Sequence, residues 1–177
     1  MHVFVSHSRV NSSSALHLCE ELQKRSVETW VDLRDAAPGA DWNQQVISAI
    51  ETAIGFVFLI GPPGHEDRGQ RFEWQQVVEQ EFYLDPSKPL IPVLIGEPEL
   101  PGFLKSRRSL ALSHTPESCA EVADQIVTTL QNPAVSIDKE KLEQGRRARV
   151  QAVESLREYT QVLSEEDVKR AGLRAVK

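Results

Sequence analysis

The sequence predicts an α/β fold in which a parallel sheet of about five strands is covered by helices on both faces. Short apolar runs alternate with longer segments in which apolar residues recur every three or four positions. Residues 56–60 form an unbroken apolar run between two glycines, which is typical of a strand buried on both faces. Because alternating strands and helices are joined by right-handed crossovers, the strands are expected to run parallel.

The expected strands are short and rich in apolar residues. They are expected over residues 2–6, 28–32, 56–60, 90–95 and 110–112. Pro92 lies within the fourth of these runs, and proline has no backbone N–H to donate to a neighbouring strand. We therefore expect the fourth strand to lie near an edge of the sheet or to contain a bulge.

Four longer segments have the spacing of amphipathic helices. The first is expected to follow a polar loop over residues 6–14 and to be capped by a serine among residues 12–14. The second is expected over residues 42–53, the third ends near residues 85–86, and the last is capped near Thr115. The inward faces comprise Ala15, Leu18, Cys19 and Leu22 in the first, Val46, Ile47, Ile50 and Ile54 in the second, Trp74, Val77, Val78 and Phe82 in the third, and Cys119, Val122, Ala123, Ile126, Val127 and Leu130 in the fourth.

A chain of 177 residues, 40% of them apolar, is long enough for one domain with a substantial core and an appendage. Its formal net charge of −6 argues against general nucleic-acid binding, which requires a basic surface. The charge is uneven. Residues 138–177 hold ten Lys/Arg and eight Asp/Glu, a net charge of +2, which leaves −8 for the first 137 residues.

The domain is expected over residues 1–131, followed by a proline-containing linker over residues 132–137. Residues 138–163 have the pattern of a long charged helix, and residues 164–167 resemble a capping box that starts one more short helix. We therefore expect a charged helical appendage over residues 138–177. It either packs back on the domain, leads into a further domain, or serves as an oligomerisation or signalling arm.

The sequence contains no run of about 18 apolar residues and opens with no apolar leader, so we expect a soluble, cytoplasmic protein with no membrane partner. Cys19 and Cys119 fall on apolar helical faces and are expected to be buried, reduced thiols. The histidines lack H-E-x-x-H spacing and the cysteines make no zinc pattern, so no metal site is expected.

Residues 31–42 form the most unusual connection in the sequence, because they are too many for a tight turn and are crowded with charge. Pro38 fixes one φ angle and Gly39 permits a positive φ, so the backbone is stiff and then sharply redirected. Trp42 opens the helix that follows. Charged loops at the carboxyl ends of buried strands are where α/β proteins place functional residues.

Two motifs resemble those of the Toll/interleukin-1 receptor (TIR) domain family. Arg-Asp-Ala-Ala-Pro-Gly at residues 34–39 resembles the RDxxPG box of the family's BB loop, and a G-x-x-W pattern overlaps its end. Val-Phe-Val-Ser-His-Ser at residues 3–8 resembles the family's first box. The resemblance covers about residues 1–130 and implies a flavodoxin-like fold, in agreement with the alternation of strands and helices.

Loops that leave the carboxyl ends of parallel strands share one edge of the sheet. The loops expected there span residues 6–14, 32–42, 61–70 and 96–103. They are expected to bring Ser8, Arg9, Arg34 and Asp35 close to the start of the helix that contains Trp74.

Glu73 is the first candidate for chemistry, because it lies in the first turn of that helix and flanks its inward face, which predicts a half-exposed carboxylate. It either stabilises positive charge in a cleft or favours the positive end of the helix. The resemblance implies the first role, since many bacterial, plant and animal TIR domains cleave NAD with a glutamate early in the corresponding helix. The tryptophan that precedes this glutamate in the family is replaced by Gly69, and spacing from the fourth strand favours Glu79, which is therefore the second choice.

The resemblance further implies that residues at this edge bind NAD as substrate, with no other cofactor. Arg9 either meets the pyrophosphate or is a solvated loop residue. Asp32 either orients the loop or a ribose or caps a turn, and Trp42 either stacks on a ring or packs in the core. The expected substrate-binding set is completed by Ser8, Arg34 and Gly39.

Two functions remain open at this point. The first is an NAD+ glycohydrolase that releases nicotinamide and ADP-ribose, or a cyclic form of it, as a bacterial defence or cell-death effector. The second is a non-catalytic interaction module. In both, the resemblance implies self-association with other TIR domains through residues 32–42, with Arg34, Asp35, Pro38 and Gly39 in contact. A phosphoreceiver-like switch at Asp32 is disfavoured, because no acidic cluster follows the first strand.

Overall fold

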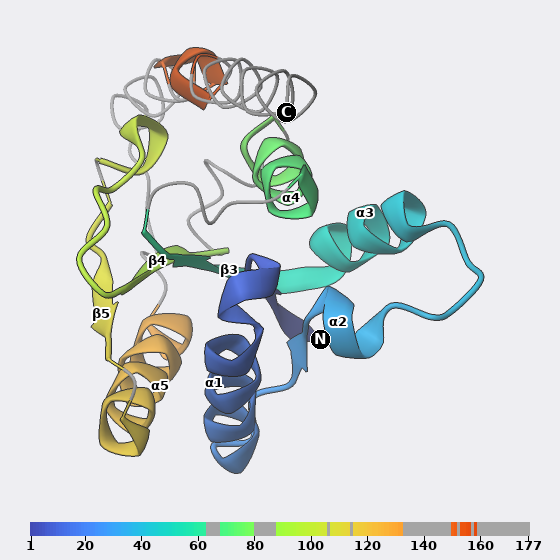
Figure 1. Ribbon diagram of the computed structural model, residues 1–177. Helices are drawn as coiled ribbons and strands as arrows, with labels where there is room; N and C mark the ends of the chain where they lie inside the picture. Colours follow the sequence, from blue (N-terminus) through green and yellow to red (C-terminus); the bar gives the residue numbers. More distant parts are fainter. Residues whose placement is uncertain are drawn as a thin grey trace, which may run out of the picture.

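The computed structural model describes residues 1–62, 68–79, 88–105, 107–113, 115–132, 150, 151, 153–156 and 158. Within them, five strands form one parallel sheet in the order β2-β1-β3-β4-β5. The strands are β1 His2–Ser6, β2 Thr29–Trp30, β3 Ala53–Ile60, β4 Leu90–Ile95 and β5 Leu110–Leu112 (Figure 1). This order confirms the predicted flavodoxin-like sheet.

Helices cover both faces of the sheet, as predicted (Figure 1). The helices α1 and α5 pack on one face, and α3 and α4 pack on the other. The described helices are α1 Ser12–Lys24, α2 Asp32–Asp35, α3 Trp42–Thr52, α4 Arg68–Glu79 and α5 Pro116–Gln131, with the 3-10 turns η1 Arg9–Asn11 and η3 Gly102–Leu104.

Alternating side chains of β1 contribute to the two cores. Val3 and Val5 pack with α1 and α5, whereas Phe4 packs with α3 and α4, because successive residues of a strand point to opposite faces. All residues of β3 except Ile54 are buried. The expected strand buried on both faces is therefore confirmed, and it extends back to Ala53.

The last helix, α5, begins as predicted. The Thr115 hydroxyl accepts a hydrogen bond from the Ser118 N–H at 3.2 Å, and Pro116 occupies the first turn. The buried face of α5 includes Cys119, Val122, Ala123 and Ile126. Cys19 and Cys119 are buried free thiols, as expected.

The connection after β1 is more ordered than the loop expected over residues 6–14. The turn η1 follows almost at once, and α1 begins at Ser12 with Asn11 at its N-cap. No serine side chain caps α1. Instead, Asn11 Nδ2 donates a hydrogen bond to Ser8 Oγ at 3.1 Å, so two buried polar side chains satisfy each other.

The second strand is shorter than expected, because α2 begins at residue 32. The Asp35 carboxylate accepts a hydrogen bond from the Val31 N–H at 2.8 Å, which closes the chain into a helical turn. The phase of α3 also differs. Ala49 takes the buried position expected for Ile47, which is partly exposed, and Ile54 belongs to β3.

The fourth strand, β4, lies second from the edge of the sheet. It pairs in regular register with β3, where Pro92 lies opposite Phe58. Pairing with the edge strand β5 starts at Val93. The expected position near an edge is therefore confirmed without a bulge, since Pro92 precedes the stretch that β5 covers.

One described residue of the appendage, Leu156, is buried in the hydrophobic cluster on the α3 and α4 side of the sheet, which also includes Phe103 and Leu104 of η3, and Val153 packs partly against the same cluster. This part of the appendage therefore packs back on the domain. Phe82, the helix end expected at residues 85–86, most of the linker and the short helix expected after residue 164 lie outside the described residues.

Candidate functional site

A cleft of about 760 Å³ lies at the carboxyl ends of β1, β2 and β3, next to the point where the strand order changes direction. The described lining comprises His7, Arg9 and Ser12 after β1, Asp32 and Leu33 in α2, Trp42 in α3, and Arg68 and Gly69 in α4. Three of the four expected loop regions therefore converge. Residues 96–103, after β4, contribute nothing to this described lining.

The walls of the cleft combine two cationic side chains with apolar surface. Arg9 and Arg68 are both exposed and line the cleft from η1 and α4. Trp42 packs its ring against Phe72 of α4, with centroids 5.6 Å apart. A guanidinium group can donate two parallel hydrogen bonds to the oxygens of one phosphate, and an aromatic ring offers a flat apolar face. The cleft therefore suits an elongated anionic ligand that carries a planar ring.

Trp42 is held in place by the start of α3. The Asp41 carboxylate caps this helix by accepting a hydrogen bond from the Gln44 N–H at 3.2 Å. The side chain of Trp42 is half-buried against the core and also lines the cleft, and its stacking on a ligand ring stays a prediction.

Glu73 lies one helical turn after Gly69 in α4, but its carboxylate is not half-exposed as expected. Glu73 is 1% exposed, and its Oε2 accepts a hydrogen bond from Ser6 Oγ at 2.5 Å. Its neighbour Trp74 is fully buried, as expected, and stacks on Phe58 with centroids 5.7 Å apart. Glu73 is therefore a buried carboxylate at the end of β1.

A second buried contact anchors α4 beside Glu73. Gln70 Nε2 donates a hydrogen bond to the Leu59 carbonyl of β3 at 2.7 Å. The Ser6–Glu73 and Gln70–Leu59 bonds together fix the first turns of α4 on the ends of two central strands. Glu79 is the last described residue of α4, roughly 9 Å further along the helix, and its side chain lies outside the described residues.

Residues 3–118, well over half of the chain, match the sequence profile of the TIR domain. The chain belongs to the TIR domain family. A search among proteins of curated function found no relative.

Solved TIR-containing structures share the fold of this TIR domain. The TIR domain of the Toll-related receptor TRR-2 from Hydra magnipapillata has a TM-score of 0.57 and 19% identity, covering 73% of this chain and 98% of that chain. A TIR-STING receptor from C. gigas in complex with 2′,3′-cGAMP has a TM-score of 0.60 and 21% identity, covering 77% of this chain and 41% of that chain. At these identities the likeness extends to the fold alone.

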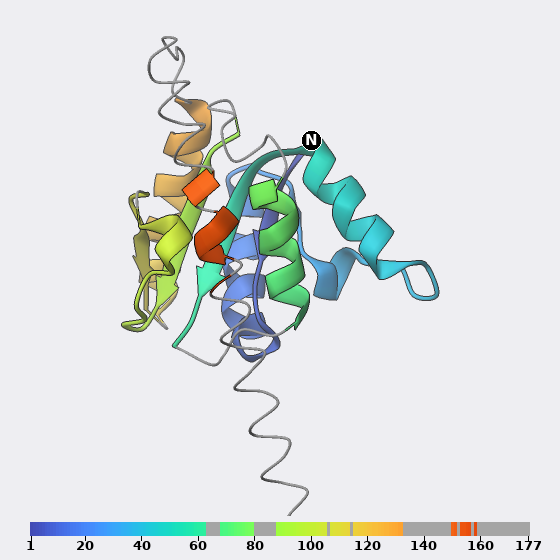
Figure 2. The ribbon, with the colours of Figure 1, turned by 90° about the horizontal axis from the view of Figure 1, so that it is seen from above.

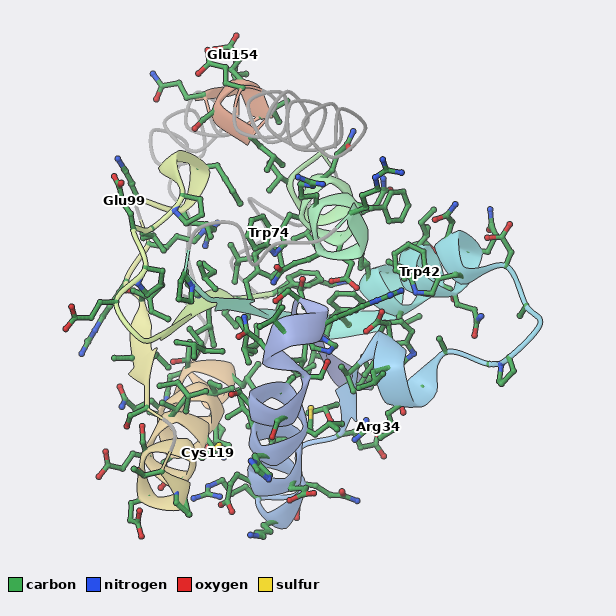
Figure 3. The ribbon with its side chains drawn as sticks, viewed as in Figure 1. Arg34, Trp42, Trp74, Glu99, Cys119 and Glu154 are labelled. Carbon is green, nitrogen blue, oxygen red and sulfur yellow. The ribbon has the colours of Figure 1, made fainter. Side chains whose placement is uncertain are left out.

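In this TIR domain, Arg34 and Asp35 turn away from the cleft. Arg34 donates hydrogen bonds to the Thr29 carbonyl and to Asp35, and Figure 3 shows it on the side of α2 away from Trp42. Burial opposes ionisation of Asp35, but hydrogen bonds from Arg34 and the Val31 N–H outweigh it, so its pKa lies below the ordinary value. The expected convergence of this pair on the cleft is therefore wrong, because α2 folds both side chains back onto β2.

The tip of the BB loop projects into solvent (Figure 2). Residues 37–41 are all exposed, including Pro38 and Gly39. Gly39 has a φ of +81°, which confirms the expected positive φ, and a Cβ there would meet nothing within 4 Å. Gln45 holds the base of the loop, because its Oε1 accepts a hydrogen bond from the Ala37 N–H at 2.6 Å. Gly39 does not belong to the described lining of the cleft.

The remaining candidates divide between the cleft and the core. Arg9 and Asp32 line the cleft, whereas Ser8 is fully buried against Asn11. Sequence reasoning missed His7, Ser12 and Arg68. The signals were present for His7, which lies inside the first box, and for Arg68, a cation at the start of the helix that carries Glu73.

No helix among the described residues has both the length and the hydropathy needed to span a bilayer. The same residues contain no group of three His, Cys, Asp or Glu side chains arranged to hold a metal ion.

Proposed function

We propose that this TIR domain is an NAD+ glycohydrolase that breaks the bond between nicotinamide and ribose. The observation that carries the proposal is the buried carboxylate of Glu73, held by Ser6 at the carboxyl edge of the sheet, one turn from the cleft wall at Gly69. Burying a charged group is costly, and such groups gather at functional sites. An apolar side chain would serve packing alone at lower cost, whereas a carboxylate at this edge can stabilise positive charge on a bound substrate.

The cleft supports a dinucleotide as the ligand. Its volume of about 760 Å³ lies within the range of small-molecule sites. Arg9 and Arg68 would bind the pyrophosphate through charge-assisted hydrogen bonds, and Trp42 would pack against a base or the nicotinamide ring. Asp32 would accept a hydrogen bond from a ribose hydroxyl.

The chemistry requires one stabilised charge. When the C1′–N bond breaks, its electron pair neutralises the pyridinium, so nicotinamide leaves without needing a proton. The ribose develops oxocarbenium character, which a nearby carboxylate stabilises electrostatically. Water then forms the new C1′–O bond and releases a proton, giving ADP-ribose. Attack by a group within the same molecule would give a cyclic product instead.

Glu73 is reached only after the site adjusts, because it is 1% exposed. The ligand must displace side chains that cover the carboxylate and exchange the Ser6 hydroxyl for a ribose hydroxyl. We therefore expect the isolated domain to be weakly active, and assembly with a second TIR domain through the exposed loop over residues 37–41 to raise its activity. We place this activity in the cytoplasm, as the NAD-consuming step of a defence or cell-death response.

The test compares Glu73→Gln with the matched variant Glu79→Gln in the same helix. The protein is incubated at high concentration with NAD+, and released nicotinamide is measured by chromatography. We expect Glu73→Gln to lower the rate at least about 100-fold and Glu79→Gln to change it little. If Glu79→Gln alone loses activity, the assigned glutamate is wrong. If neither the wild type nor any variant releases nicotinamide, the enzyme function is refuted.

A non-catalytic interaction module is the second candidate. The observation that favours it is the exposed loop tip, whose charged neighbours Arg34 and Asp35 are turned outward from the cleft. A scaffold would self-associate through this loop and would release no nicotinamide. Glu73→Gln would then lower only its stability and leave its self-association unchanged. Sedimentation of the wild type and of Glu73→Gln, beside the nicotinamide measurement, separates the two functions.

A further inference from the structure

A serine, a histidine and an aspartate meet in the cleft at the end of β1. His7 Nε2 lies 3.3 Å from Ser12 Oγ, and His7 Nδ1 lies 3.7 Å from Asp32 Oδ1. The first distance is a hydrogen bond. The second exceeds hydrogen-bond length but permits charge attraction, and such contacts commonly shorten when a ligand binds. All three residues line the cleft, so this group faces the proposed substrate.

The surroundings of His7 favour one proton arrangement. The carboxylate of Asp32 favours a proton on Nδ1, which leaves the lone pair of Nε2 directed to Ser12. The Ser12 hydroxyl also donates a hydrogen bond to the Arg9 carbonyl at 2.8 Å. Its proton can therefore point to either acceptor by rotation about one bond, which makes Ser12 able to pass a proton to His7.

The three residues differ from an ordinary cluster on the protein surface, because the histidine among them is buried. The side chain of His7 is 3% exposed, whereas that of Asp32 is 28% exposed. Ser12 is partly exposed at the first position of α1. A water molecule in the cleft would thus meet the serine hydroxyl, and the imidazole behind it would be shielded from bulk solvent.

The relay and Glu73 lie on opposite faces of the sheet at the same strand end. Ser6 points to α4 and contacts Glu73, whereas His7 points to α1 and contacts Ser12. Successive side chains of an extended chain alternate in this way. A substrate that lies across the end of β1 would therefore meet the carboxylate on one side and the relay on the other.

We propose that Ser12, His7 and Asp32 form a proton relay that activates the water molecule attacking the ribose. This inference rests on the proposed glycohydrolase function. As the water oxygen bonds to C1′, its proton passes to Ser12 Oγ, and the serine proton passes to His7 Nε2. Asp32 stabilises the imidazolium, which later returns its proton to solvent. The sum is NAD+ plus water giving ADP-ribose, nicotinamide and a proton.

The charges around His7 set the behaviour of the relay. Asp32 in α2 lies 3.7 Å from the imidazole of His7, and Arg9 in η1 and Arg68 in α4 line the same cleft. Glu73 contributes a carboxylate across the end of β1. A bound pyrophosphate would pair with the two arginines and leave Asp32 as the charged group beside the imidazole.

The relay makes a distinctive prediction about the fate of the ribosyl intermediate. Capture by water requires that a proton be removed, whereas recapture by nicotinamide requires none. Loss of the relay should therefore slow formation of ADP-ribose while leaving nicotinamide exchange intact. A merely structural defect would lower both rates together.

The experiment supplies the full chain with NAD+ and isotopically labelled nicotinamide. It measures ADP-ribose formation and incorporation of label into NAD+. We expect His7→Gln to slow ADP-ribose formation by about 100-fold while exchange stays within about twofold of the wild type. His17→Gln, at an exposed position of α1, is the matched control and should change neither rate.

Asp32→Asn decides the matter if His7→Gln fails to fold. Asp32 Oδ1 also accepts a hydrogen bond from the Leu33 N–H at 2.7 Å, which an asparagine oxygen can retain. Asp32→Asn should raise the ratio of nicotinamide exchange to ADP-ribose formation, as His7→Gln should. NAD cleavage with an unchanged ratio in both variants would overturn the relay and leave the glycohydrolase standing. Absence of nicotinamide release from the wild type would refute the glycohydrolase, and the relay with it.

Discussion

Ser6→Ala removes the hydroxyl that holds Glu73 and should loosen the contact between β1 and α4. Ser6 is fully buried, and its Oγ lies 2.5 Å from Glu73 Oε2. A hydrogen bond to a charged group contributes roughly 1.5–3 kcal/mol to stability. In a chain of this size, each 1 kcal/mol shifts the Tm by roughly 2–4 °C. We therefore expect the free energy of unfolding to fall by roughly 1.5–3 kcal/mol and the Tm by about 3–12 °C.

Urea unfolding followed by circular dichroism measures this loss. A double-mutant cycle of Ser6→Ala and Glu73→Ala isolates the contact, because the double variant should lose less than the sum of the single losses, by about 1 kcal/mol or more. Ser13→Ala, at an exposed position of α1, is the control for a serine that makes no such contact with α4. Additive losses, or a Ser6→Ala stability equal to that of Ser13→Ala, would refute the reasoning.

Two further predictions concern the exposed loop and the thiols. Gly39→Val forces a β-branched residue into a φ of +81°, at a position where a Cβ meets nothing within 4 Å. The strained loop should lose its contacts with a second copy, which should remove the rise in NAD-cleaving activity per milligram expected over about a hundredfold increase in protein concentration. A flat wild-type profile would show instead that each chain carries a complete site. Burial raises the pKa of the Cys19 and Cys119 thiols, so fewer thiolates form at about pH 8 and iodoacetamide should label the native protein slowly. Unfolding should expose two reactive thiols; rapid labelling of the native protein, or a disulfide, would contradict the assignment.

The sheet and its flanking helices were predictable because their signals are local. The run over residues 56–60 is apolar at every position, and the cap at Thr115 lies directly before a periodic segment. The turn α2 was not predictable, since it depends on the Asp35 carboxylate reaching back to the Val31 N–H within a charged stretch. Charge alone suggested an open loop there.

The candidate site was predictable in location but not in geometry. A cleft does lie at the carboxyl edge that topology indicated, and Arg9, Asp32 and Trp42 line it. The burial of Glu73 escaped prediction because its partner Ser6 is 67 residues away in the sequence. The contact of His7 with Ser12 was missed for a related reason, because the start of α1 could not be fixed among several serines.

The direction in which neighbouring side chains leave β1 has a consequence for how this segment tolerates change. Val3, Phe4 and Val5 are almost completely buried in alternate cores, so the register of the strand is fixed on both faces. Deleting or inserting one residue before Ser6 would exchange the faces to which the hydroxyl and the imidazole point. A substitution in β1 changes one contact at a time. A change in the length of β1 would instead break the Ser6–Glu73 contact and the His7–Ser12 contact together. The length of β1 is therefore more tightly constrained than the identity of its residues.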